Sequence, residues 1–436
     1  MPANSRYKWW VVLMLWTICV CNYADRQAIF SVFPLLEREL RLTPVQLGLL
    51  GSAFAWVYGL AAPLAGMIVD RVERRTAILG GLHAWSWICV ATALSRNFRH
   101  LFLFRAAEGL GETFYYPASM SLISDYHGRD TRSRAMGLHQ TSVYVGTIAG
   151  GFFAGWIGQY YGWRLSFVVF GGLGIVLAMV LRRFLTEPPR GAMDAAAFAK
   201  ATASVAVALR RPASPPPALP LTSFLRLAAR TPTLLCLMGA FVCANFVAVV
   251  LLSWMPTFLY DRFHMSLAMG GLTATLFVQV ASMIGSPIGG WLADVWTRAW
   301  KGPGRPARGR LAVQLIGVAG GAPFVALCGL APSVGVLIAA LTAWGFFKGL
   351  YDANIFASAF EVVGPEARGT AAGFMNAIGW LAGGGTAPIV IGLIAERQSL
   401  GVAIALASTM YVAAAALLLT AILFFVTRDA SRIANP

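Results

Sequence analysis

Hydrophobic residues occur along this chain in twelve long runs that are separated by short polar segments. Each run holds roughly 20 residues, the length that an α-helix needs to cross the hydrocarbon core of a bilayer. Because backbone groups inside a bilayer must be hydrogen-bonded within the segment, we expect each run to be helical. The sequence therefore predicts an all-α membrane protein with twelve transmembrane helices, at residues 9–33, 45–67, 77–95, 101–124, 135–158, 163–184, 232–259, 267–292, 311–330, 334–356, 369–395 and 401–426.

A long polar interruption separates the first six runs from the last six. It contains Glu187-Pro188-Pro189, an alanine-rich middle and a proline-rich stretch around Pro215. This composition is typical of a linker that is part helix and part extended chain. We therefore predict an N-terminal six-helix bundle at residues 1–184, a cytoplasmic linker at 185–231 and a C-terminal six-helix bundle at 232–436.

Short motifs recur at corresponding places in the two halves. Gly66-x-x-x-Asp70 follows the second run, and Gly290-x-x-x-Asp294 follows the eighth. An Arg-x-x-Ala-x-Gly pattern enters both the fifth run and the eleventh, at residues 132–137 and 368–373. Such recurrence predicts an internal repeat, and so two pseudo-symmetric bundles.

The composition and the placement of charge narrow the class of protein. Charged residues make up 12% of the chain, against about 25% in soluble domains. Of the 34 Lys and Arg residues, 24 fall in segments on the side of both termini, seven fall on the other side, and Arg26, Arg105 and Lys348 lie inside runs. The positive-inside rule then predicts cytoplasmic termini in the inner (plasma) membrane. This rule accounts for the net charge of +16 without nucleic acid as a partner.

Ionisable residues inside the first and fourth runs are the candidate functional residues. Asp25 and Arg26 are adjacent in the first run, and Arg105, Glu108 and Glu112 share one helix face in the fourth. Unpaired charges at this depth cost several kcal/mol or more, so such residues face a wet cavity or pair with each other. A carboxylate whose surroundings alternate between wet and dry takes up and releases protons.

Asp25 and Glu112 are therefore the predicted proton carriers, and Arg105 can bind an anion. The alternative is a structural ion pair that locks two helices, such as Asp25 with Arg105. We interpret Glu108 as a structural group that either neutralises Arg105 or lies near the external end of its helix.

A charged loop motif follows the second run. Its glycine allows close helix approach, its aspartate can attract the N-terminus of a neighbouring helix, and its arginines can pair across the loop. Contacts of this kind can form in one conformation and break in another, which predicts a gating role. The alternative is a loop that only carries the positive charge of the cytoplasmic side. The predicted gating residues are Gly66, Asp70, Arg71, Arg74 and Arg75, with Gly290 and Asp294 as a second copy in which Val295 replaces the arginine.

The arrangement of six plus six runs, the basic linker and this loop motif resemble the major facilitator superfamily of secondary transporters. Asn22-Tyr23-Ala24-Asp25-Arg26 resembles the first-helix signature of its anion:cation symporter family. Arg105-x-x-x-Gly109-x-x-Glu112-x-x-x-x-Pro117 resembles the fourth-helix signature. That family moves sugar acids and other organic anions, usually with protons, and spinster-like transporters of lysolipids and sphingoid phosphates share similar stretches. The resemblance matches Asp25 and Glu112 to proton-titrating carboxylates, and Arg26 to a group that binds the substrate's carboxylate.

Other polar residues inside runs could line a central cavity. Lys348 forms a cluster with Asp352 and Asn354 that either reaches the cavity or is a salt bridge near a helix end. The full set of predicted substrate-binding residues is Arg26, Arg105, Tyr115, Tyr116, Gln140, Tyr144, Asn245 and Lys348.

The leading hypothesis is a proton-coupled carrier of a small organic anion that works by alternating access. The alternatives are a spinster-like carrier of an amphipathic lipid anion and a sensor that binds a ligand without transport. The sequence has no GxxxxGK[ST] loop and no HExxH or GxSxG motif, so we expect neither ATP drive nor enzymatic activity. The six cysteines lie inside runs without CxxC spacing, so we expect no metal and no cofactor. The expected partners are the substrate, protons and the bilayer, with the protein as a monomer.

Overall fold

The computed structural model describes residues 6–189, 193, 221–299, 305–364 and 367–434, and regular structure in these ranges is helical. The first half forms a bundle of six spans, with a short helix α2 (Phe33–Leu40) after the first. The fourth span consists of two helices, α5 and α6. The helices of this bundle are α1 (Tyr7–Ser31), α3 (Pro44–Val69), α4 (Arg74–Thr92), α5 (Phe98–Glu112), α6 (Tyr115–Tyr126), α7 (Arg129–Tyr161) and α8 (Trp163–Phe184).

The second half forms a bundle of the same kind, preceded by α10 (Leu221–Arg230). Three of its spans are single helices: α11 (Pro232–Phe263), α12 (Leu267–Ala299) and α13 (Arg305–Leu330). The tenth span is α14 (Val334–Asp352) with α15 (Ile355–Phe360). The eleventh is α16 (Arg368–Ile378), η2 (Gly379–Gly384) and α17 (Ala387–Arg397). The twelfth is α18 (Leu400–Leu406), α19 (Ser408–Thr420), η3 (Ala421–Phe425) and α20 (Val426–Ala434).

Each of the twelve predicted spans coincides with one of these helices or helix runs, so the predicted fold class is confirmed. In the described ranges, eight helices are long and apolar enough to cross a membrane by hydropathy alone. Helix α1 is not among them because it carries Asn22, Asp25, Arg26 and Gln27, all of them buried inside the protein. Most of the predicted linker lies outside the described residues, and the predicted bundle boundaries stay predictions.

Two spans are interrupted where their sequence disfavours a regular α-helix. In the fourth, Pro117 cannot donate a backbone hydrogen bond to Thr113, and the α-helix is broken between Glu112 and Tyr115. In the eleventh, the glycine-rich stretch adopts the wider π-helix η2, and the amide of Gly385 donates to the carbonyl oxygen of Trp380 at 2.6 Å. Both interruptions lie beside the central site described below.

The two bundles touch closely at one end of the molecule. A Cβ at Gly48 of α3 would lie 2.3 Å from the carbonyl oxygen of Pro388 in α17, and one at Gly271 of α12 would lie 1.9 Å from that of Gly151 in α7. The Trp56 indole also donates to the carbonyl oxygen of Leu381 at 3.2 Å. Only glycine lets backbones approach to this degree, so this end is closed.

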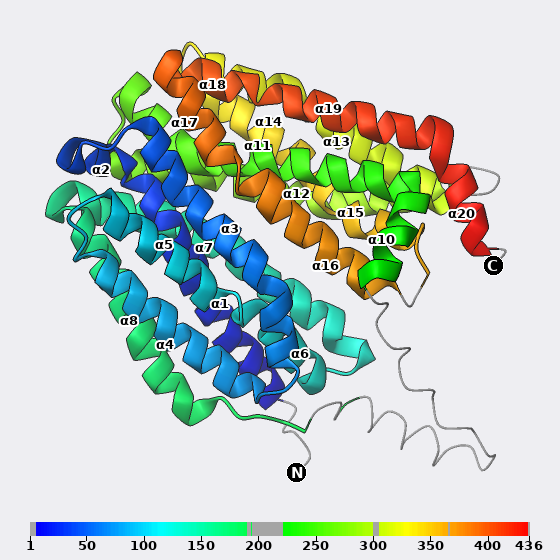
Figure 1. Ribbon diagram of the computed structural model, residues 1–436, viewed down its shortest axis with the longest axis horizontal. Coiled ribbons are helices and arrows are strands. Elements are labelled where there is room, and N and C mark those ends of the chain that lie inside the picture. Colours follow the sequence, from blue (N-terminus) through cyan, green and yellow to red (C-terminus); the bar gives the residue numbers. More distant parts are fainter. Residues whose placement is uncertain (1–5, 190–192, 194–220, 300–304, 365–366, 435–436) are drawn as a thin grey trace.

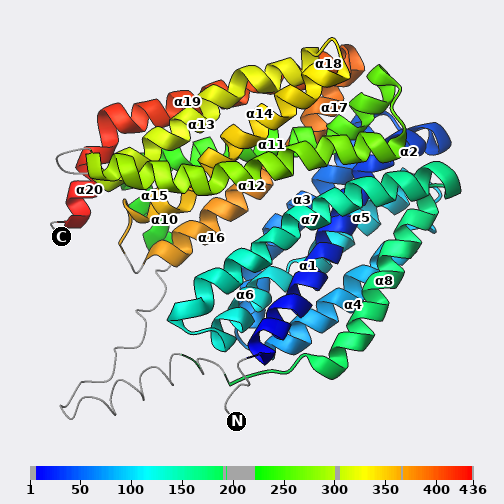
Figure 2. The same ribbon diagram turned by 180° about the vertical axis from the view of Figure 1, so that it is seen from behind.

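The bundles diverge toward the end that holds both termini, as Figures 1 and 2 show from opposite sides. At that end, a Cβ added to Gly66, Gly137, Gly290 or Gly373 would have nothing within 4 Å. The structure is therefore closed at the α2 and α17 end and open toward the termini. Among the described residues no neighbour lies against the two motif glycines in this conformation, and their gating role stays a prediction.

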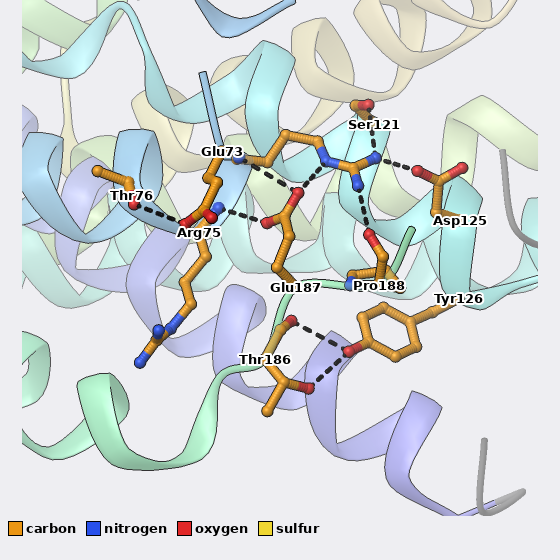
Figure 3. A network of polar contacts seen from close by, with 10 residues as sticks. Glu73, Arg75, Thr76, Ser121, Asp125, Tyr126, Thr186, Glu187 and Pro188 are labelled. Carbon is orange, nitrogen blue, oxygen red and sulfur yellow. Dashed lines mark hydrogen bonds and ion pairs between the residues drawn. The ribbon is translucent and has the colours of Figure 1, made fainter. Parts of the chain in front are cut away.

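Arg74 of the loop motif is 1% exposed and joins three segments of the chain. Its guanidinium pairs with Asp125 at the end of α6, and with Glu187 after α8 at 2.7 Å. Figure 3 shows how Glu187 and Asp125 converge there, with Tyr126 bonded to Thr186 beside them. The contacts of Arg74 thus join α4 to α6 and to the start of the predicted linker. In the second copy, Asp294 pairs with Arg310 at 3.5 Å.

We expect Arg74→Ala to lower the unfolding free energy by about 3 kcal/mol, because it leaves two carboxylates without their shared partner. The exposed Arg71 offers a matched control for charge, and Arg71→Ala should leave stability nearly unchanged. Thermal unfolding of the purified variants in detergent measures both effects. Equal midpoints for the two variants would contradict a stabilising role for the Arg74 network.

Candidate functional site

A cavity of about 270 Å³ lies between the two bundles, near the middle of the spans. Its charged lining residues are Arg26, Arg105, Lys348 and Asp352, and its side-chain amides are Gln27, Gln140, Asn245 and Gln279. Much of the remaining wall is aromatic, from Tyr23, Phe30, Phe54, Tyr144, Phe241, Trp344, Tyr351, Trp380 and Tyr411. The cavity therefore combines two arginines on the wall of the N-terminal bundle, a lysine and an aspartate on the wall of the C-terminal bundle, and apolar and hydrogen-bonding surface between them.

Arg26 of α1 links the cavity to a buried carboxylate. Its Nη2 and Nε atoms donate to the same Glu112 oxygen, Oε2, at 2.5 and 3.0 Å. The side chain of Glu112 is fully buried, whereas that of Arg26 is 11% exposed. Atom Nη1 of Arg26 has no hydrogen-bond partner among the described residues. Glu112 is outside the cavity lining and lies behind the arginine.

An aromatic cage surrounds the Arg26 guanidinium. Its central carbon lies 4.6 Å from the ring centres of both Tyr23 and Phe54, and 5.0 Å from that of Tyr58. Trp380 reaches within 5.7 Å of the same carbon from the opposite bundle. Cations over aromatic faces are stabilised by about 0.5–2 kcal/mol each, so the cage holds the guanidinium in place.

Arg105 of α5 forms a second pair with Glu108 at 2.5 Å, and both side chains are fully buried. Its Nε and Nη2 atoms have no partner among the described residues. Because Arg105 and Arg26 both lie within 5 Å of the Phe54 ring centre, the two guanidinium groups are within about 10 Å of each other. Three of their N–H-bearing atoms, one on Arg26 and two on Arg105, have no partner among the described residues, and all three are buried. Guanidinium groups with unused donors are suited to bind an anion.

Asp25 faces the interior of the N-terminal bundle, away from the cavity lining. It is 2% exposed, and its Oδ1 atom has no hydrogen-bond partner among the described residues. Asp25, Cys89 and Glu108 each offer one ligand atom within 4.8 Å of the others, and among the described residues they form the group that could hold a metal ion. The Arg105 guanidinium on Glu108 opposes a cation there.

Four further residues of the predicted substrate-binding set line the cavity: Gln140, Tyr144, Asn245 and Lys348. Lys348 also pairs with Asp352, one turn further along α14. Lys348 therefore both reaches the cavity and forms a salt bridge, as the two interpretations of this cluster predicted. The structural pair of Asp25 with Arg105 is not formed, because Arg105 bonds to Glu108 on its own helix.

Tyr115 and Tyr116 are not among the residues that line the cavity. The Tyr115 hydroxyl donates to the carbonyl oxygen of Leu15 at 2.6 Å and contacts His139 at 2.8 Å. Tyr116 is 41% exposed and is not part of the lining. The break after Glu112 changes the rotation of the chain, so helical spacing from Glu112 does not carry into α6.

Sequence reasoning missed two residues that connect the bundles at the site. Trp380 packs edge-on against Tyr58 with ring centres 5.6 Å apart, in addition to its contact with Arg26. Gln27 donates to the carbonyl oxygen of Leu252 at 2.9 Å across the interface. The available signals were a tryptophan inside a glycine run and an amide next to Asp25-Arg26 in the first span.

Two helical bundles around a charged cavity that opens at one end define a membrane transporter. Residues 15–304 match the Major Facilitator Superfamily, which is more than half of the chain, and the chain belongs to this superfamily. It is thus a multi-pass membrane transport protein and not an enzyme.

Similar proteins include carriers of different named cargoes. The chain is 25% identical to the hexuronate transporter of Bacillus subtilis, over 87% of this chain and 86% of that protein. It is 28% identical to protein spinster homolog 1 of Homo sapiens, over 89% of this chain and 73% of that protein. A solved bacterial homolog of the human lysosomal transporter Spinster superposes with a TM-score of 0.76 at 22% identity, over 98% of both chains. This last likeness shows the shared fold.

Proposed function

We propose that the protein is a proton-coupled carrier of a small organic anion, a sugar acid or another carboxylate, that works by alternating access. One observation carries the proposal: Arg26 at the cavity wall is held from behind by the buried carboxylate of Glu112. A substrate carboxylate and Glu112 then compete for the same guanidinium. Protonation of Glu112 favours the substrate, and its deprotonation favours release.

This competition supplies the free-energy difference that a carrier needs. A ligand can shift a conformational equilibrium only by its differential affinity for the two states. With Glu112 protonated, the anion's charge is neutralised by Arg26, and the loaded site has less net charge to carry through the closed interior. Asp25 is the second proton carrier in this proposal.

The size of the cavity favours a small substrate. Its volume of about 270 Å³ lies just below the roughly 300–1,000 Å³ that is typical of drug-sized ligand sites. The amides of Gln140, Asn245 and Gln279 suit the hydroxyl groups of a sugar acid, and the hexuronate carrier among the relatives agrees with that class.

A second candidate is a carrier of an amphipathic lysolipid or sphingoid-phosphate anion. It is favoured by the aromatic wall of the cavity and by the 28% identity to a spinster homolog. An acyl chain would need space beyond the cavity, through the open end between the bundles. Competition for uptake between D-glucuronate and lysophosphatidate distinguishes the two candidates.

The charge pattern supports an orientation with both termini in the cytoplasm, since 24 of 34 Lys and Arg residues lie on that side. In this orientation the open end faces the cytoplasm, and the closed end faces outward. The proposal places the carrier in the inner (plasma) membrane as a monomer.

Uptake of D-glucuronate into proteoliposomes should rise with an inward proton gradient, and Arg26→Gln should lower it by about 10–100-fold. The reason is that a hydrogen bond to a charged group contributes roughly 1.5–3 kcal/mol. Arg99→Gln, at an exposed position in the first turn of α5, is the matched control and should transport normally. Gradient-independent uptake would overturn proton coupling, and the absence of counterflow for both D-glucuronate and lysophosphatidate would overturn transport in favour of a sensor.

A further inference from the structure

The buried charges of the N-terminal bundle do not balance if all are ionised. Three carboxyl groups, on Asp25, Glu108 and Glu112, lie with the two guanidinium groups of Arg26 and Arg105, and each of the five residues is at most 9% exposed. Full ionisation would leave one net negative charge in a dry interior. Such a charge costs several kcal/mol, so the cluster is neutral only if it holds one proton.

The hydrogen bonds indicate where this proton resides. Glu112 accepts two N–H groups from Arg26, and Glu108 accepts one from Arg105. Asp25 Oδ1 and Glu108 Oε1 have no partner among the described residues. A carboxylate oxygen of Asp25 lies within 4.8 Å of one of Glu108, a gap that rotation of either carboxyl group can close to a hydrogen bond.

Of the other groups near Glu108, Glu112 also has one oxygen, Oε1, without a partner among the described residues, but its Oε2 accepts both N–H groups of Arg26. Helix α1 contributes Asp25 and Arg26, and α5 itself contributes Arg105 and Glu112. From α4, Cys89 lies within 4.8 Å, but its thiol is oriented to the carbonyl oxygen of Phe167 at 3.4 Å. Helix α3 presents Tyr58, which lies against Arg26 instead. Two carboxylates this close cannot both ionise cheaply.

We propose that Asp25 and Glu108 share one proton, and that Glu108 alternates between Arg105 and this shared proton. With no anion bound, Glu108 neutralises Arg105 and Asp25 holds the proton. An anion at Arg105 displaces the Glu108 carboxylate and adds one negative charge, so Glu108 takes a second proton from water at the open end. This role in transport rests on the proposed function, whereas the shared proton is a property of the resting protein.

Infrared difference spectroscopy on the purified protein, without ligand, tests the shared proton. We expect the wild type to show a C=O stretching band of a protonated carboxyl group at neutral pH that shifts in heavy water. Asp25→Asn and Glu108→Gln should each remove its full amplitude, because either change leaves two carboxylates for two guanidinium groups. Cys89→Ala is the matched control in the same cluster and should keep the band, as should Glu108→Asp.

Two results would overturn the inference: a wild type without the band, or a band that persists in Glu108→Gln. The second would mean that Glu108 is a permanent counter-ion of Arg105 and that Asp25 holds its proton alone. The wild-type spectrum tests the presence of the shared proton even where a variant fails to fold. A band that behaves as expected in a protein without proton-driven uptake would refute the proposed function only, and the reverse would refute this inference only.

Discussion

Replacing Glu112 with glutamine should abolish proton-driven uptake, by about 100-fold or more, while substrate binding persists. Glutamine can still accept a hydrogen bond from Arg26, so the cage and the cavity keep their shape. It carries no charge and exchanges no proton, so the anion meets no competitor for Arg26 and the proton at this position no longer drives the cycle. Driving a two-state protein from 1:99 to 99:1 takes roughly 5.5 kcal/mol, and neutralising a buried carboxylate is a contribution of that order.

The measurement compares two modes of transport in the same proteoliposomes. Uptake against an imposed proton gradient should be lost in Glu112→Gln, while exchange of labelled for unlabelled D-glucuronate without a gradient should continue. Glu73→Gln, on the exposed loop before α4, should behave as the wild type in both assays. If Glu112→Gln accumulates substrate with unchanged pH dependence, the proton is carried elsewhere.

The fold was predictable because the length and hydropathy of the apolar runs in a sequence identify membrane-spanning helices. Even α1, which fails a hydropathy threshold, was recognised from the length of its apolar run. The cost of buried charge then marked the ionisable residues inside it. The same cost identified Arg26 and Arg105, which line the cavity, and Glu112 and Asp25, which lie behind it.

The pairing of these charges was predictable only in part: neutralisation of Arg105 by Glu108 was one of two expected roles and is observed, whereas the pair of Arg26 with Glu112 was not expected. Successive residues on a helix point about 100° apart, so a small difference in helix rotation decides whether Arg105 meets Asp25 or Glu108. The pairs observed, Arg26 with Glu112 and Arg105 with Glu108, depend on how α1 and α5 are rotated against α3 and α4. Sequence spacing alone gave Glu108 only a structural role.

Contacts between the bundles could not be predicted from the sequence either. Trp380 lies about 350 residues from Arg26 along the chain, and only the packing of η2 against α3 brings it to the cage. The position of Tyr115 depends on a helix break, which the sequence signals through Pro117 but does not place to the residue.

The glycine contacts at the closed end predict a second large effect. Gly271→Val should shift the protein away from the conformation described here and abolish transport. A Cβ at this position would lie 1.9 Å from the backbone oxygen of Gly151 and 3.0 Å from the Ser31 hydroxyl. A backbone oxygen cannot move aside as a side chain does, so α12 and α7 must separate and this end must open. Alternating access requires the end to close once in each cycle, and a carrier that cannot close it stays in one state.

Spin labels on opposite bundles report the separation directly. We would attach them through Arg99→Cys and Arg262→Cys, both exposed at the closed end, in a background without the six native cysteines. Gly271→Val should move the distance distribution to longer values, whereas Gly172→Val in α8, where a Cβ would have nothing within 4 Å, should leave it unchanged. Unaltered distances together with normal uptake in Gly271→Val would mean that this contact does not close the α2 and α17 end during transport. Of the glycine contacts described above, this one brings two backbones closest together. The experiment therefore tests the tightest contact of the closed end.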